Sequence, residues 1–198
     1  MLVDAMNFPF ENVKAVQAAC QLIRRDGGRI NVMKLVKLLY LLDRLSLERR
    51  DVPVIGGRYY SMRNGPVMSE VLDLINSGTL FGEKESIWES FITDRENHEV
   101  GLRVGDIPTD ELSEAELDLI EEIWTEHGGK NQWELSQWCH ENCAEWRPLE
   151  ESREIISLGD IGRALGLSGE RVEAMDACAQ EDRFIARALS SPNPVPTQ

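Results

Sequence analysis

Long apolar runs and cysteines are both scarce in this chain of 198 residues. No stretch approaches the roughly 20 consecutive apolar residues that a transmembrane helix needs. The first residues, Met1 to Asp4, lack the basic start and the apolar core of an export signal. The four cysteines show no spacing typical of a disulfide framework. We therefore expect a cytoplasmic protein with reduced thiols and no membrane partner.

The motifs of the common enzyme classes are also missing. The sequence contains no GxxxxGKS or GxxxxGKT phosphate loop, no GxSxG nucleophile turn and no HExxH zinc helix. Its acidic pairs, Glu121-Glu122 and Glu150-Glu151, are sequence neighbours that diverge on a helix and cannot share a substrate. We therefore predict that the protein is not an enzyme and needs no cofactor.

One group of residues resembles a metal site in its spacing, namely Cys139, His140 and Cys143. On a regular helix the two cysteines share a face, whereas His140 is rotated away by about 100°. The sequence offers no evident fourth ligand, and the neighbours Cys139 and His140 do not face each other as a catalytic dyad must. We predict no metal site here and keep a metal-dependent hydrolase only as an alternative.

Basic residues are outnumbered, because 35 Asp and Glu against 21 Lys and Arg give a net charge of -14. Residues 1–82 carry 11 basic and 8 acidic side chains, residues 83–126 carry 3 and 15, and residues 127–198 carry 7 and 12. Such an acidic chain is repelled by phosphate backbones unless it gathers cations on one face. Nucleic acid is therefore a poor candidate partner, and the acidic 83–126 region fits either a basic partner protein or a solvated face.

Helical periodicity dominates the first third of the chain. A first helix is predicted from near Asn7 to the glycines at 27–28. A second helix, residues 32–49, begins at the cap residue Asn31 and has almost no polar face, so it is predicted to be buried at the centre of the core. A third helix is predicted from Val67, after a turn at residues 64–66.

The periodicity changes after residue 86. Two alternating stretches, Ile87 to Thr93 and His98 to Val104, flank a polar turn and predict a β-hairpin near residues 88–104. Two further helices are predicted from their N-terminal capping boxes, Ser113 with Glu116 and Asn131 with Glu134. Two more helices are predicted over residues 158–165 and 169–189.

We therefore predict an α+β fold that is predominantly helical, with a buried central helix and a small antiparallel β-hairpin or sheet. A single domain is expected over residues 1–190, in which residues 157–190 form a helical C-terminal part. The proline-rich tail, residues 191–198, is expected to be disordered.

The segment from Leu158 to Val172 has the order helix, Gly-Leu-Ser turn, helix that is typical of DNA-binding helix-turn-helix motifs. A DNA reader needs basic and amide side chains at the start of its second helix. Here that helix begins Gly169-Glu170-Arg171-Val172-Glu173, with two acids among five residues. A helical hairpin packed on the domain is the better interpretation.

A candidate binding surface is formed by Arg58, Tyr59, Tyr60, Arg63 and the turn Gly65-Pro66-Val67. Tyr and Arg dominate the energetics of protein interfaces, because each joins a large contact area to a polar tip. The alternative is that the tyrosines pack on the central helix and Gly-Pro is only a turn. The sequence leaves both interpretations open.

Three stretches, taken in order, resemble the Panacea domain, also called the SocA-like antitoxin domain. The first is KLVKLLYLLD at residues 34–43, and the second is RYYSMRNGPV at residues 58–67. The third is LSQWCH at residues 135–140, which is followed by Trp146. The resemblance spans most of the chain, from residue 15 to about residue 165.

Members of this family are encoded beside a toxin in bacteria or phages and block that toxin, and some hand it to a protease. The resemblance therefore implies an antitoxin whose partner is a cognate toxin, with a protease of the AAA+ class as a second possible partner. Arg58 and Tyr59 are expected to anchor the toxin, so that replacing both by Ala weakens binding without unfolding the protein. His140 and Trp146 are expected to brace the opposite side of the surface. A DNA-binding autorepressor of its own operon is the alternative function.

Overall fold

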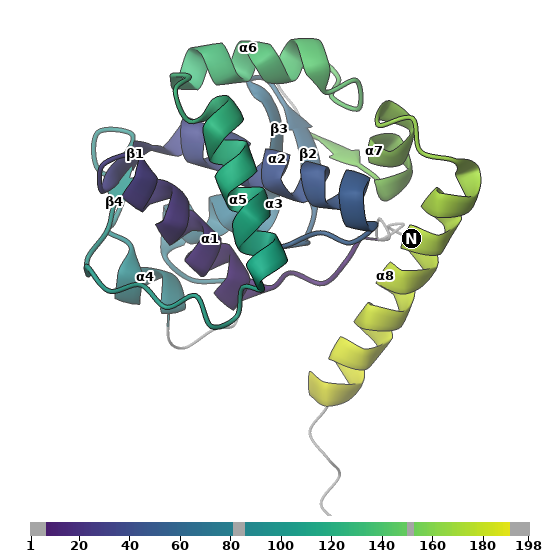
Figure 1. Ribbon diagram of the computed structural model, residues 1–198, viewed down its shortest axis with the longest axis horizontal. Helices are drawn as coiled ribbons and strands as arrows, with labels where there is room; N and C mark the ends of the chain where they lie inside the picture. Colours follow the sequence, from purple (N-terminus) through teal and green to yellow (C-terminus); the bar gives the residue numbers. More distant parts are fainter. Residues whose placement is uncertain (1–6, 81–85, 150–152, 191–198) are drawn as a thin grey trace, which may run out of the picture.

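The computed structural model describes residues 7–80, 86–149 and 153–190. Within these ranges the chain forms eight helices and five short strands (Figure 1). The helices are α1 (Asn12–Arg25), α2 (Val32–Arg50), α3 (Ser69–Ser77), α4 (Ile87–Phe91), α5 (Glu114–His127), α6 (Gln132–Asn142), α7 (Leu158–Ala164) and α8 (Gly169–Ser190). The strands are β1 (Arg29–Asn31), β2 (Tyr59–Met62), β3 (Gly65–Met68), β4 (Glu99–Gly101) and β5 (Glu154–Ile156).

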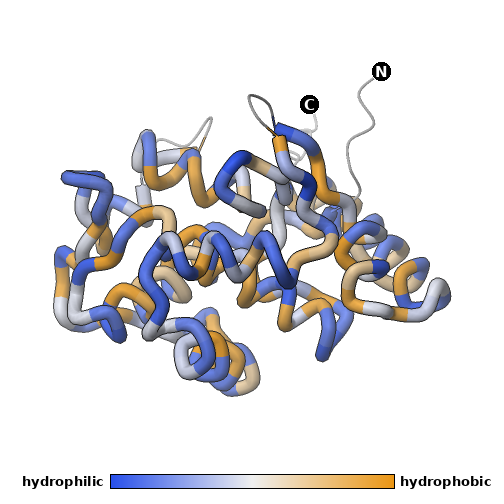
Figure 2. The backbone as a smooth tube through the Cα atoms, turned by 90° about the horizontal axis from the view of Figure 1, so that it is seen from above, coloured by the Kyte–Doolittle hydropathy of each residue, from blue (hydrophilic) through white to orange (hydrophobic). Residues whose placement is uncertain are grey.

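Helix α2 lies at the centre, as its apolar sequence predicts. It contacts α1, α3, α5, α6 and α7 and strands β1 and β3, so it is covered on several sides (Figure 1). The predicted cap is confirmed, because the Asn31 side chain accepts hydrogen bonds from the Met33 and Lys34 amides at 3.0 and 3.4 Å. Helices α1, α3 and α5 are amphipathic. Figure 2 shows polar and apolar residues interspersed along the backbone.

Two small antiparallel sheets complete the fold. The strand order of the larger one is β3-β2-β5, and β2 and β3 are joined by the tight turn at Arg63 and Asn64. The smaller one pairs β1 with β4. The predicted fold class is thereby confirmed: the protein is a predominantly helical α+β fold with a buried central helix and small antiparallel sheets.

The predicted β-hairpin at residues 88–104 is wrong in its first strand. Ser86 caps a helix instead, accepting a hydrogen bond from the Glu89 amide at 3.0 Å, and Trp88 on that helix is buried. The second predicted strand is shortened to β4, which pairs with β1 from the start of the chain. The hairpin pairing itself is retained by two isolated antiparallel bridges, Ile92 with Leu102 and Glu96 with Glu99.

Several boundaries also differ from expectation. Helix α1 begins at Asn12 rather than near Asn7, and α3 begins at Ser69 because Val67 belongs to strand β3. Both predicted capping boxes of α5 and α6 are confirmed. The expected tail, residues 191–198, lies outside the described residues.

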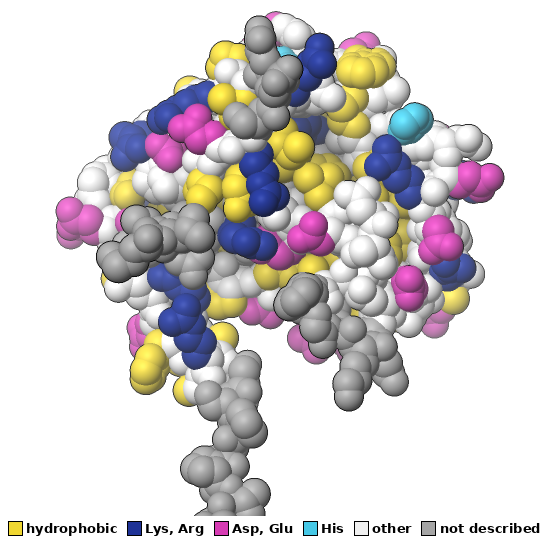
Figure 3. All heavy atoms as spheres, turned by 180° about the vertical axis from the view of Figure 1, so that it is seen from behind, with side chains coloured by type: hydrophobic (Ala, Val, Ile, Leu, Met, Phe, Trp, Pro, Cys, Tyr) yellow, Lys and Arg dark blue, Asp and Glu magenta, His cyan; other side chains and the backbone are white. Residues whose placement is uncertain are grey.

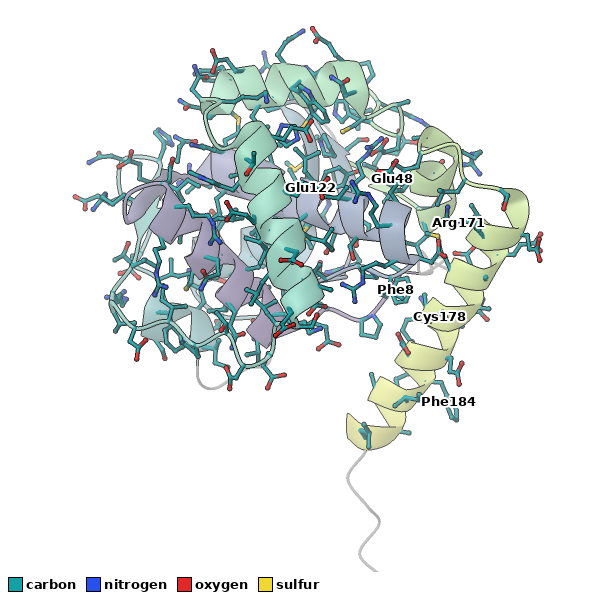
Figure 4. The ribbon with its side chains drawn as sticks, viewed as in Figure 1. Phe8, Glu48, Glu122, Arg171, Cys178 and Phe184 are labelled. Carbon is teal, nitrogen blue, oxygen red and sulfur yellow. The ribbon has the colours of Figure 1, made fainter. Side chains whose placement is uncertain are left out.

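The C-terminal helices α7 and α8 form a hairpin that packs on the domain. A Cβ at Gly162 on α7 would lie 2.5 Å from a methyl carbon of Val172 on α8, so the two helices pack closely. Arg171 bonds to Asp51 at 2.7 Å and to the Glu48 carbonyl at 2.8 Å (Figure 4). Met175 and Ala179 on α8 are also buried, whereas the last turns of α8, which carry the exposed Phe184 and Leu189, extend away from the body of the domain (Figure 1). In the described part of the chain, no helix is both long and apolar enough to cross a membrane.

Candidate functional site

Asp43 on α2 fixes the loop that precedes β2. Its buried carboxylate accepts hydrogen bonds from the amides of Val54, Ile55 and Gly56 at 2.8–2.9 Å and from the Tyr59 hydroxyl at 2.8 Å. Burial raises the pKa of the Asp43 carboxyl to about 6, and these four donors hold the pKa below the value that burial alone would give. The carboxyl is therefore ionised at pH 7, and it ties α2 to the start of the hairpin.

A second buried group joins α2 to the segment after α6. The Glu145 carboxylate accepts hydrogen bonds from the Tyr40 hydroxyl at 2.7 Å and from Arg44 Nε at 2.8 Å. Glu145 itself is buried, so Arg44 is needed to balance its charge. The polar residues of the motif at 34–43 thus connect the central helix to the two other motifs.

Tyr59 is a core residue and not a surface anchor. Its side chain is 1% exposed, and its ring packs edge-on against Tyr40 with centroids 5.9 Å apart. The predicted placement of Tyr59 on the binding surface is therefore wrong, and we expect its replacement together with Arg58 to destabilise the fold. Tyr60 is also buried, and the Arg153 guanidinium lies 4.9 Å from its ring centroid. Of the two alternatives that the sequence left open, packing in the core is the one the structure shows for both tyrosines.

Arg58 remains exposed, but its cation is already paired. Its Nε donates to Glu70 at 2.8 Å, and its amide donates to the same carboxylate at 2.9 Å. This ion pair raises the pKa of Arg58. Because both partners belong to the segment around β2 and α3, the pair orders that segment and leaves Arg58 less available to a partner protein.

The Gly65-Pro66-Val67 turn is explained by a lysine beneath it. Lys37 on α2 is 1% exposed, and its Nζ donates to the Pro66 carbonyl at 2.7 Å. A Cβ at Gly65 would lie 2.9 Å from that Nζ, and Gly65 also has a φ of 103°. Glycine is therefore required both by the backbone conformation and by the close approach to Lys37.

The third motif supports the same hairpin from α6 and the loop that follows it. Ser136 donates to the Asn64 carbonyl at 2.8 Å, and Trp146 Nε1 donates to the Met62 carbonyl at 2.8 Å. The His140 ring stacks on Trp146, with centroids 3.9 Å apart. His140 and Trp146 are thus in contact and brace the hairpin, whereas a contact between either residue and a toxin stays a prediction.

A groove of about 800 Å³ opens beside this hairpin. It lies between the start of α2, the β2–β3 hairpin, α3, the loop before β4 and the start of α6, and we call it the hairpin groove. Figure 3, which views the side opposite to Figure 1, shows hydrophobic side chains flanked by Lys and Arg. The groove is lined by the cations Lys37, Arg63 and Arg95 with His98, by the amides Asn31, Asn64, Asn97 and Gln132, by Gly65, and by the apolar residues Val32, Met33, Val36, Met62, Val67, Leu72 and Trp133.

Three predicted site residues line the hairpin groove: Arg63, Gly65 and Val67. Sequence reasoning missed Lys37 and Trp133. Lys37 could have been found as a charged residue on a helix with almost no polar face. Trp133 is 63% exposed. A large aromatic residue is usually buried, so the sequence gives no sign of this exposure.

Lys37 is a buried cation whose removal should not harm the fold. Burial lowers its pKa to about 8, so the charged form is disfavoured in the folded protein. We expect Lys37→Met to leave the free energy of unfolding unchanged at pH 7 or to raise it by up to about 2 kcal/mol. Between pH 8 and 10.5 Lys37 is protonated in the unfolded chain but mostly neutral in the folded protein, so the free energy of unfolding of the wild type should rise with pH in this range. Lys37→Met lacks this group, so any stability advantage of the variant at pH 7 should shrink as the pH rises.

Lys34 provides the matched control for that measurement, one helical turn earlier on α2. Its Nζ pairs with Asp26 at 2.6 Å and donates to the Gly128 carbonyl at 2.8 Å. Lys34→Met should therefore lower the free energy of unfolding by about 1–2 kcal/mol in urea titrations. A larger loss for Lys37→Met than for Lys34→Met would contradict this description of Lys37.

The cysteine-histidine group does not converge on a common point. Cys139 and Cys143 are buried and adjacent, and a hydrogen bond from Cys143 lowers the pKa of the Cys139 thiol. His140 is directed instead to Trp146. In residues 7–80, 86–149 and 153–190, no three His, Cys, Asp or Glu side chains are grouped so that they could hold a metal ion.

The helix-turn-helix segment has its cations engaged within the chain. Arg163 pairs with Asp160 at 2.6 Å, and Arg171 pairs with Asp51 at 2.7 Å. A recognition helix presents such side chains to base edges and phosphates. The geometry therefore favours the packed helical hairpin for this segment.

Comparison with known proteins connects the three motifs. Neither the curated proteins nor the solved structures gave a match to this chain. The family model described as antitoxin SocA-like, Panacea domain, matches residues 35–147, which is more than half of the sequence. That range includes nearly all of the hairpin groove and its supports. The chain therefore belongs to the SocA-like antitoxin family with a Panacea domain.

Proposed function

We propose that this protein is an antitoxin that neutralises a toxin by binding it directly in the hairpin groove. Membership of the SocA-like antitoxin family supports the role. The observation that carries the location is the groove itself, with a volume of about 800 Å³ and a hairpin that is hydrogen-bonded to residues of the other two motifs. The toxin is the proposed partner, and the cytoplasm is the proposed compartment.

The groove offers the residue types that contribute most to protein interfaces. Trp133 is exposed at the start of α6, and Arg63 is exposed at the tip of the hairpin. Trp and Arg are enriched among residues whose truncation costs the most binding energy. Their backbones are held by an α-helix and a two-stranded turn, so little flexibility is lost when a partner binds.

The test of the proposed function is growth rescue. The product of the neighbouring gene is induced alone and then together with this chain, and colony formation is followed. The proposal expects the neighbour to be toxic alone, to become harmless on co-expression, and to co-purify with the chain. A toxic neighbour that the chain neither rescues nor binds would refute the proposal.

Trp133→Ala is expected to reduce growth rescue, because it removes an exposed aromatic residue from the hairpin groove. Truncating an exposed hot-spot aromatic should weaken toxin binding by about 2–4 kcal/mol while leaving the folded chain intact. Phe184→Ala is the matched control, because Phe184 is also a highly exposed aromatic, 75% against 63%, but lies on the projecting part of α8 (Figure 4). Loss of rescue with Phe184→Ala and full rescue with Trp133→Ala would move the interface to α8.

Two further features belong to the same proposal. An adaptor role, in which the bound toxin is handed to a protease of the AAA+ class, is separated from plain neutralisation by whether toxin levels fall during rescue.

A DNA-binding autorepressor would show a salt-sensitive gel shift on its own promoter. We expect none, because Arg163 and Arg171 are paired with carboxylates of this chain.

A further inference from the structure

The hairpin groove differs in charge from the chain as a whole. Among the described residues that line it none is Asp or Glu, although the chain has 35 acidic and 21 basic residues. Arg95 contacts Asn76 and His98. Arg63 forms no ion pair within the described part of the chain. An anionic group is therefore the kind of ligand that this groove stabilises.

Lys37 supplies the second unpaired charge, at the base of the groove. Lys34 and Lys37 are both buried on α2, but only Lys34 has a carboxylate partner, Asp26 at 2.6 Å. Lys37 donates to the neutral carbonyl of Pro66, and no ion pair joins it to a carboxylate of the described residues. A buried ammonium without an anion is costly to keep, whereas an anion supplied by a ligand compensates it.

Apolar surface lies beside these cations. Met33 and Leu72 are half-buried in the groove wall, Met62 is 36% exposed, and Trp133 presents its exposed ring at the mouth. A ligand that carries only charge leaves this surface in contact with water. A ligand with a large apolar group next to its anionic group buries the apolar surface and pairs the cations together.

The overall charge of the chain argues for a peptide as that ligand rather than a polyanion. At -14 the protein repels a long phosphate chain that extends past the groove. A peptide with one or two carboxylates places its charge only where the cations are. A volume of about 800 Å³ accommodates a few side chains of such a peptide.

We propose that the hairpin groove binds a peptide segment of the toxin in which an Asp or Glu stands next to a large apolar residue. The inference rests on the proposed antitoxin function and names the chemistry of the partner. The carboxylate pairs with the exposed Arg63 close to the buried ammonium of Lys37, and the apolar side chain packs against Met33, Leu72 and Trp133. Gly65 leaves room for this pairing, because a side chain there would lie against Lys37 Nζ.

The test uses short random peptides displayed in a library and selected for binding to the full-length chain. Selected peptides are expected to combine an acidic residue with an adjacent Leu, Ile, Phe or Trp. Lys37→Met and Arg63→Ala should each weaken their affinity about tenfold or more in calorimetric titrations. Lys34→Met, the same replacement one turn away, should leave the affinity within about twofold, because its charge is already paired.

Three results overturn the inference: selected peptides that are basic or uncharged, peptides that bind Lys37→Met and Arg63→Ala as tightly as the wild type, and a selection that yields no binder. A mixed-sequence RNA oligonucleotide is titrated in parallel. If RNA binds in the groove and competes with the peptides, nucleic acid replaces peptide as the ligand.

Growth rescue separates this inference from the antitoxin function. Rescue by the wild type that is unaffected in Lys37→Met and Arg63→Ala leaves the antitoxin function standing and overturns the ligand chemistry. Acidic-apolar peptides that require Lys37, without rescue of any neighbour, leave the ligand chemistry standing and overturn the antitoxin function.

Discussion

Replacing Tyr59 with Ala is expected to lower the free energy of unfolding by about 3–5 kcal/mol, the cost of truncating a large buried aromatic side chain. The Tyr59 ring is 1% exposed and packs edge-on against Tyr40, so its removal leaves a cavity beside the central helix. Its hydroxyl also donates to the buried Asp43 carboxylate at 2.8 Å. Urea unfolding followed by tryptophan fluorescence measures the loss directly.

Two replacements serve as controls for Tyr59→Ala. Tyr59→Phe keeps the ring and removes only the hydroxyl, so it should cost about 1–2 kcal/mol. Arg58→Ala at the next residue removes a half-exposed ion pair with Glu70 and should cost less than about 1 kcal/mol. If Tyr59→Ala were no less stable than Arg58→Ala, the placement of the tyrosine in the core would be wrong.

Asp43→Asn is the replacement with the second largest expected effect on stability, a loss of about 2–4 kcal/mol in the free energy of unfolding at pH 7. Four donors converge on this carboxylate, the amides of residues 54–56 and the Tyr59 hydroxyl. An asparagine offers only one acceptor oxygen. Its NH₂ group would face two of the four donors, which now donate hydrogen bonds to the second carboxylate oxygen. The shape of the site is retained, so the loss reports hydrogen bonding rather than packing.

Asp118→Asn tests whether the effect depends on burial. Asp118 is exposed on α5, and the same chemical change there should alter the free energy of unfolding by less than about 0.5 kcal/mol. A loss at Asp43 that is no greater than the loss at Asp118 would mean that the carboxylate does not organise the loop before β2.

The helices of the core could be predicted from the sequence because their signals are local. Asn31, Ser113 and Asn131 cap their helices in the structure as their sequence context predicts. The strand predicted over residues 87–93 failed for the opposite reason. Alternation there was outweighed by the Ser86 cap and the buried Trp88, and β4 found its partner in β1, far away in the sequence.

The candidate site was only partly predictable for a similar reason. The motif at 58–67 indicated the right hairpin, but only tertiary packing decides which side chains face solvent. Tyr59 turned inward to Asp43, and Arg63 remained at the groove. The role of Lys37 depends on its contacts with Gly65 and Pro66, and Pro66 is 29 residues away in the sequence. Local sequence patterns cannot predict such contacts.

The most direct measurement of the central claim is a calorimetric titration of the purified toxin into this chain, without any protease present. The account predicts saturable binding at one toxin per chain, with affinity lost in Trp133→Ala and retained in Phe184→Ala. If the chain rescues cells from the toxin but the purified toxin gives no binding signal with the purified chain, neutralisation by direct binding is contradicted.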